Sequence, residues 1–206
     1  MRKHLKKTLV GVTIDQQLKF SNHIQNAVKK ANRVLGCLAR TFRHLNKDTF
    51  RLLYKAMVRP HLEYASCVWC PHLIKDRDLI EQVQRRATRL VPETKGLPYN
   101  SRLKELQLPT LNYRRQRTDI IQTFKIIKRI DTVNQDCRCS QCPSKLMFKK
   151  ASGTTRGHSE KLQTQRATGY RHHFFSTRVV KMWNSLSDDT VQARRVNELK
   201  SRLRRD

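Results

Sequence analysis

The chain has 206 residues, of which 44 are Lys or Arg and 16 are Asp or Glu, so its formal net charge is +28. An excess of this size repels itself in a compact protein and favours a polyanionic partner, nucleic acid before an anionic membrane surface. Apolar residues make up 37% of the chain, which predicts a small core, and no apolar run approaches the roughly 18 residues of a membrane span.

The first predicted element is a short strand over residues 9–14, which are apolar and β-branched and are followed by Asp15 as a turn signal. A lone strand leaves unpaired backbone edges, and the sequence offers no obvious partner for it. We therefore expect residues 1–16 to be the remnant of a sheet in a preceding domain.

Two helices are predicted next. Ser21 is placed to cap a helix that runs to about Phe42. Asp48 is placed to cap a second helix through Val58, and Pro60 is expected to break or restart it, because proline lacks the amide donor and clashes with the preceding turn. The basic residues opposite the apolar face of the first helix are Lys29, Arg33 and Arg40.

Later helices repeat this design. Helices are predicted over about 78–91, 102–106 and 111–130, and the first of these ends before Pro92 and Gly96. The apolar stripe of the long helix comprises Tyr113, Ile120, Phe124 and Ile127. The outward basic residues of these helices are Arg85, Arg86 and Arg89, then Arg115, Lys125 and Arg129. Repeated basic outer faces predict a shared phosphate-contacting surface without readout of base sequence.

Apolar periodicity stops over residues 131–170, where we expect a flexible linker. Residues 171–206 are expected to be a C-terminal helical segment, in which Asp188 and Asp189 end one helix and a final basic helix follows. The expected core stripe of this segment is Phe175, Val179, Met182, Trp183 and Leu186. The predicted fold class is therefore mostly α, with one short N-terminal strand.

A group of cysteines indicates an alternative function. The thiols of Cys137, Cys139 and Cys142, with the imidazole of His158, are soft ligands that suit zinc, although their spacing is not that of a standard finger. They make a stand-alone, zinc-stabilised nucleic-acid-binding module the alternative. A second set, Cys67-x₂-Cys70-x-His72, is expected to be buried thiols, because it lies beside Trp69 in an apolar stretch.

A series of short sequence motifs occurs in a fixed order along most of the chain. They occupy residues 11–15, 20–24, 30–36, 59–65, 84–88, 102–106, 108–111, 113–115, 155–159, 174–176, 178–180 and 183–186. The most distinctive is Arg59-Pro60-His61-Leu62-Glu63-Tyr64-Ala65. The series resembles the region after the polymerase palm in LINE-type, jockey-like non-LTR retrotransposon reverse transcriptases.

The resemblance implies a fragment of an RNA-directed DNA polymerase. Residues 1–16 would hold the last palm strand, 17–130 a helical thumb that grips the template–primer, 131–170 a linker and 171–206 the C-terminal extension. The implied partners are an RNA–DNA or DNA duplex backbone and the palm and fingers of the parent polymerase, with no membrane, and the expected location is intracellular and nuclear.

The catalytic residues of that family have no counterpart here. Its palm holds Mg²⁺ with an Ala-Asp-Asp box, whereas the only Asp-Asp pair of this chain, Asp188–Asp189, follows a predicted helix. We therefore expect no enzyme activity and no cofactor for the chain itself. A relic reading frame without selected activity is a further alternative.

Overall fold

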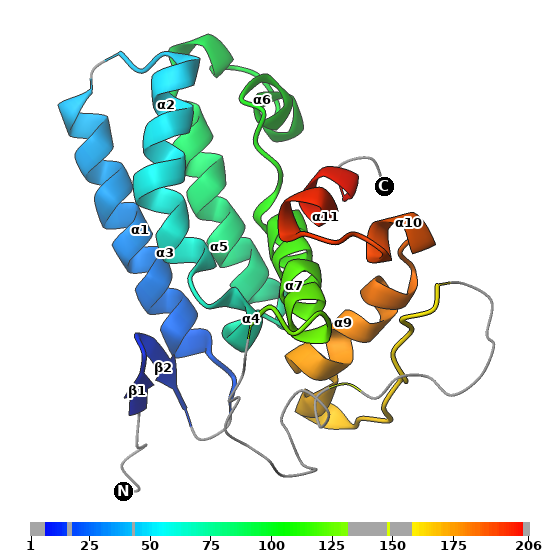
Figure 1. Ribbon diagram of the computed structural model, residues 1–206. Helices are drawn as coiled ribbons and strands as arrows, with labels where there is room; N and C mark the ends of the chain where they lie inside the picture. Colours follow the sequence, from blue (N-terminus) through cyan, green and yellow to red (C-terminus); the bar gives the residue numbers. More distant parts are fainter. Residues whose placement is uncertain (1–6, 16–17, 43, 132–147, 149–157, 204–206) are drawn as a thin grey trace, which may run out of the picture. The chain divides into compact units, whose positions relative to one another are not determined.

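The computed structural model describes residues 7–15, 18–42, 44–131, 148 and 158–203. These residues are mostly helical, with one short sheet, as the sequence predicts (Figure 1). The chain divides into two compact units, 1–115 and 116–206, called unit 1 and unit 2 below. The division falls inside α7 (Leu111–Ile127), whereas the sequence predicted a boundary at residue 130.

The N-terminal residues form a β-hairpin in place of the expected lone strand. β1 (Lys7–Leu9) pairs antiparallel with β2 (Val12–Ile14), with Leu9 opposite Val12. Val10 and Gly11 form the turn with φ of 46° and 77°, the left-handed pair of a two-residue type I′ turn. The sequence did not indicate this turn because Val10 is β-branched, and turns of this type usually begin with Asn, Asp or Gly.

Three helical stretches of unit 1 lie alongside one another (Figure 1). They are α1 (Ser21–Thr41), the stretch from α2 (Lys47–Leu53) to α3 (Arg59–Glu63), and α5 (Ile74–Ala87). Ser21 does not cap α1; its hydroxyl donates to Asp76 of α5 at 2.8 Å, so it joins two helices. Asn46, and not Asp48, caps α2, because its side chain accepts from the Thr49 amide at 2.7 Å.

Pro60 lies within a continuous helical stretch and does not break it. Between α2 and α3 the chain makes one π-helical turn (Tyr54–Val58), and the Arg59 amide donates to the Tyr54 carbonyl five residues back. The wider turn accommodates a proline that lacks a donor and would crowd the preceding turn of a regular α-helix. A π-helical turn contains one residue more than an α-helical turn, and the sequence pattern did not indicate this extra residue.

Shorter elements complete unit 1. They are α4 (Ser66–Trp69), 3₁₀ turns at Thr88–Leu90 and Pro92–Thr94, and α6 (Tyr99–Glu105). The core joins α1, α3, α5 and α6, and its fully buried members include Ile24, Val58, Leu62, Trp69, Ile80, Leu106 and Leu111.

Unit 2 contains the later part of α7, a 3₁₀ turn at Gly169–His173, α9 (Phe175–Asn184), α10 (Asp188–Val191) and α11 (Val196–Arg202). Val179 and Trp183 are fully buried in its core, which confirms the predicted stripe. Phe148, His158 and Leu162 are also buried, so part of the expected linker contributes to this core. Asp188 and Asp189 begin α10, behind the cap Ser187, and do not end the preceding helix.

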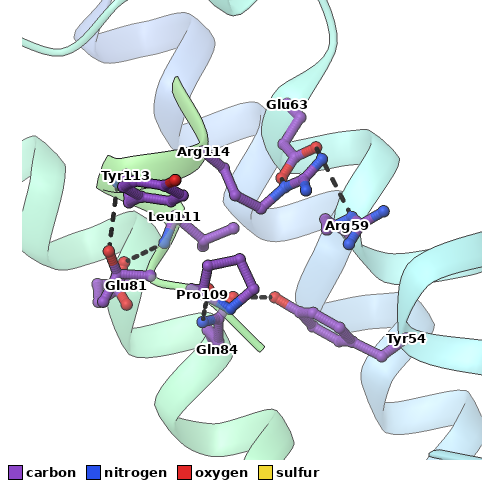
Figure 2. Close-up of polar contacts among 10 residues, drawn as sticks. Tyr54, Arg59, Glu63, Glu81, Gln84, Pro109, Leu111, Tyr113 and Arg114 are labelled. Atoms are coloured by element: carbon purple, nitrogen blue, oxygen red, sulfur yellow. Dashed lines mark hydrogen bonds and ion pairs between the residues drawn. The ribbon is translucent and has the colours of Figure 1, made fainter. Parts of the chain in front are cut away.

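A buried polar network sets where α7 begins in unit 1 (Figure 2). The Tyr54 hydroxyl donates to Oε1 of Gln84 at 2.7 Å, and Nε2 of Gln84 donates to the Pro109 carbonyl at 3.0 Å. One turn earlier on α5, Glu81 accepts from the Leu111 amide at 3.2 Å. Burial raises the pKa of Tyr54 well above its ordinary value, so its hydroxyl stays protonated and keeps donating.

A second contact joins α3 to the start of α7. The carboxylate of Glu63, at the end of α3, accepts from Nε and Nη2 of Arg114, with Nη2 2.8 Å from Oε2. Oε2 also lies 3.6 Å from Nε of Arg59 on the same helix (Figure 2). The hydrogen bonds to Glu63 raise the pKa of Arg114. One half-buried carboxylate thus holds Arg114 by two hydrogen bonds and lies close to Arg59, so both guanidinium groups have a partner within unit 1.

Replacing Gln84 by Leu is expected to destabilise unit 1. The change leaves the Tyr54 hydroxyl and the Pro109 carbonyl without their partner in a buried position, at about 1–3 kcal/mol for each group. The control is Gln82→Leu, on the exposed side of the same helix. Denaturant unfolding measures both variants, and equal free energies of unfolding for the two would contradict the role given to Gln84.

Candidate nucleic-acid interface

The outer side of α1 carries positive charge only. Lys29, Lys30, Arg33 and Arg40 are all exposed, and the helix contains no Asp or Glu. None of the four has an ion-pair partner among the residues that the structure describes. These side chains differ in this respect from Arg59 and Arg114, and they can contact an external anion.

A groove of about 720 Å³ lies beside this face, between the β-hairpin, α1 and α3. We call it the hairpin groove, and its polar walls are formed by Lys29, Lys30, Arg33, Thr13, His61 and Tyr64. Its lining among the described residues includes no Asp or Glu. The Tyr64 hydroxyl donates to the Val10 carbonyl at 3.1 Å, which ties the end of α3 to the turn of the hairpin.

His23 joins the hairpin to α1 at the bottom of this groove. Its Nδ1 accepts from the Thr13 amide at 3.3 Å, and its ring contacts the Trp69 ring edge-on, with centroids 5.1 Å apart. Burial, and after it the charge of Lys30, lowers the pKa of His23. The imidazole is therefore neutral near pH 7, which is the form in which Nδ1 can accept a hydrogen bond.

The cations of α5 extend the positive surface from the other side of α1. Nη1 of Arg86 donates to Oδ1 of Asn32 on α1 at 3.0 Å, so Arg86 lies where the two helices meet. Arg85 is exposed and lies over the Tyr99 ring, with its guanidinium carbon 4.9 Å from the ring centroid. Arg89 is exposed as well. The predicted outward orientation of all three is confirmed.

The predicted outward orientation of Arg115 is wrong. Its side chain is only 2% exposed, and neither Nε nor Nη1 has a hydrogen-bond partner. Burial lowers its pKa. Arg115 lies one turn after Leu111, so both residues are on the same, buried face of α7.

The predicted stripe of α7 is confirmed at Phe124, which is buried, and at Ile120 and Ile127, which pack against the core of unit 2, and it is wrong at Tyr113. Tyr113 is 45% exposed, whereas Phe124 and Ile126 are buried in the second core. Because α7 supplies Leu111 to the first core and Phe124 to the second, no constant face describes the whole helix. In unit 2, Lys125 is half-buried and pairs with Asp131 at 3.2 Å, while Arg129 is exposed.

Sequence reasoning missed Lys30, His61 and the groove itself. Lys30 follows Lys29 directly and could have been included, because α1 contains no acidic residue that would neutralise it. The groove could not have been found in the same way, since the turn at Val10 and Gly11 was not recognised and the hairpin is one of its walls.

Only one of the four predicted zinc ligands, His158, is among the residues that the structure describes. Cys137, Cys139 and Cys142 lie outside them. His158 is buried, with Nε2 3.0 Å from the Trp183 carbonyl and its ring edge-on to Trp183. Cys67 and Cys70 are half-buried, and no three His, Cys, Asp or Glu side chains in the described part of the chain form a metal-binding group. The zinc site stays a prediction.

Similarity to known proteins gives no indication of function. Among the described helices, none combines the length and the apolar character that crossing a bilayer requires. Comparisons of the chain with protein-family models, with curated proteins and with solved structures found no match.

Acidification is expected to loosen the hairpin through His23. The pKa of His23 in the folded protein is below its ordinary value of about 6.5. Neutral His23 therefore contributes its full stability above about pH 6.5, and this contribution is lost as the pH falls through the folded-state pKa. Unfolding free energy measured between about pH 8 and pH 5 should fall by at most about 1.4 kcal/mol per pH unit from this group. This part of the decline should be absent in His23→Gln.

His61→Gln is the matched control, because His61 is an exposed histidine of the same groove. It should retain the decline that His23→Gln loses. Hydrogen exchange of the Thr13 amide gives a local measurement, since protonation removes its acceptor. Superimposable pH profiles for the wild type and His23→Gln would rule out His23 as the titrating group.

Proposed function

We propose that the chain holds a nucleic-acid duplex by its phosphate backbone, as the thumb and C-terminal part of a LINE-type reverse transcriptase. The single observation that carries the proposal is the positive face of α1, which among the described residues has no ion-pair partner and adjoins a groove without acidic lining. Paired cations stabilise a protein, whereas unpaired, exposed cations gathered on one helix favour a polyanion.

The geometry of α1 suits a series of phosphates. From Lys29 to Arg40 the helix rises about 16 Å, the length of about five base-pair steps along a duplex. Arg86 adds a cation at the junction with α5. Lysine and arginine contacts to phosphate fix the position of a duplex and carry no sequence information, so the expected binding is insensitive to base sequence.

The residues that carry the family resemblance also build this site. The sequence motif at 59–65 forms α3 and the turn after it, and contributes His61 and Tyr64 to the hairpin groove. The motif at 30–36 contributes Lys30 and Arg33. In the proposed assignment, residues around the hairpin adjoin the palm of the parent polymerase, and α1 and α5 face the template–primer.

Charge reversal on α1 tests the proposed function. The double variant Lys29→Glu/Arg33→Glu is expected to lower the affinity for an RNA–DNA duplex at least tenfold. Loss of two phosphate contacts should also reduce the slope of log affinity against log salt by about 1.8, or 0.9 per contact. Binding is measured by fluorescence anisotropy over a series of salt concentrations.

The matched control reverses the same charge elsewhere in unit 1. Lys95 and Lys104 are exposed and precede or belong to α6, which lies apart from α1 in Figure 1. Lys95→Glu/Lys104→Glu should reduce affinity less and leave the salt slope nearly unchanged. Equal losses for the two double variants would show a general charge effect and would overturn the assignment to α1.

The proposal gives this chain no catalytic step. Asp188 and Asp189 are exposed at the start of α10, and Asp189 pairs with Arg202 at 2.9 Å, so they form no paired-carboxylate metal site on a strand. The purified chain is therefore expected to incorporate no nucleotide on a primed RNA template with Mg²⁺. Template-dependent synthesis that Asp188→Asn abolishes would refute this part of the proposal.

A further inference from the structure

Unit 2 carries an exposed segment in which two aromatic rings flank a cluster of basic and imidazole side chains. Residues 161–187 contain no Asp or Glu, and the segment within them at 166–174, called the aromatic–basic segment, is largely exposed. Tyr170 is 48% exposed and Phe174 is 41% exposed. Three exposed basic or imidazole side chains lie between the two rings, namely Arg171, His172 and His173, and Arg166 precedes them.

We propose that the aromatic–basic segment binds single-stranded nucleic acid. Unpaired bases would stack on the rings of Tyr170 and Phe174, and the guanidinium groups of Arg166 and Arg171 would contact the phosphates. Surfaces that bind single strands without sequence preference combine these two elements, because every base has a π-face and every nucleotide has a phosphate. This site is in unit 2 and does not depend on the duplex-binding face of α1.

Two consecutive phenylalanines, Phe174 and Phe175, lie in different environments. The Phe175 ring packs edge-on against Phe148, with centroids 5.8 Å apart, and lies 5.6 Å from the Arg178 guanidinium carbon. Phe174 caps α9 and leaves its side chain exposed. The ring of Phe175 therefore packs against the core of unit 2, whereas the ring of Phe174 lies at the surface, four residues from Tyr170.

The exposed rings stand on an anchored backbone. Nη1 of Arg178 donates to the His173 carbonyl at 2.9 Å, and the same guanidinium binds both oxygens of the buried Asp119 at 2.9 Å. The Phe174 amide donates to the Arg171 carbonyl at 3.1 Å. Because the backbone is held before a ligand arrives, binding costs less conformational entropy than it would on a free chain.

The pattern favours a single strand over a duplex or a membrane. In a duplex the base faces are already stacked on one another, so an exposed aromatic ring gains contact area only with unpaired bases. A membrane-surface helix presents a broad apolar face opposite a charged one. Here cations separate the two rings, and the Gly169–His173 segment is one short 3₁₀ turn.

Alanine substitution of both rings tests the proposal in the full chain. Tyr170→Ala/Phe174→Ala should weaken binding to a non-complementary single-stranded RNA of about ten nucleotides by roughly tenfold or more. The ring-retaining variant Tyr170→Phe/Phe174→Tyr is the matched control and should bind nearly as the wild type. Both positions are exposed, so thermal unfolding should show that the alanine variant remains folded.

Two further probes separate the possible outcomes. An abasic single strand has the same phosphates and no bases, so the alanine variant and the wild type should bind it equally. Equal binding of the RNA by these two proteins, or an equal loss on the abasic strand, would overturn the proposal, as would a loss seen only with phosphatidylserine vesicles. Binding of a duplex should depend on Lys29 and Arg33 and not on the rings, so failure here leaves the duplex-binding proposal standing.

Discussion

The buried amide of Gln84 is the interaction on which unit 1 depends. One side chain accepts from Tyr54 of the π-helical turn and donates to the Pro109 carbonyl, so three segments that are distant in the sequence meet at a single point. A buried amide can satisfy both groups only in one arrangement, whereas apolar contacts tolerate small shifts. The network therefore fixes where α7 leaves unit 1, and the helices that bear the cations are held around it.

The structure divides its positive charges into two groups with different physical roles. Arg114 binds Glu63 of α3 and Arg178 binds Asp119 of α7, so these two guanidinium groups connect elements within a unit, and Arg59 lies beside Glu63 on the same helix. The cations of α1 have no such partner among the described residues and remain at the surface. Of the 16 Asp and Glu residues, Glu63 and Asp119 pair with arginines where the side chains are largely shielded from water and an unpaired charge would be costly.

The two proposed binding surfaces use different chemistry. On α1, the outward charges are all positive and no large aromatic ring accompanies them, which suits the regular phosphates of a duplex. On the aromatic–basic segment, exposed rings accompany the charge, which suits bases that are not paired. A chain that handles a junction between duplex and single strand would use both kinds of surface.

Helical periodicity and composition determined much of this protein without the structure. The sequence indicated a mostly α fold, the apolar and basic sides of α1 and α5, and the core stripe around Val179 and Trp183, because these follow from residues close together on one helix. Only the tertiary structure decided the rest. The β-hairpin needed a turn whose first residue is an unusual valine, and the helix continues past Pro60 because a π-turn makes room for it. Arg115 is buried because it lies one turn after Leu111, a member of the first core, and which face of α7 is covered is decided by the elements that pack on it and not by its own period.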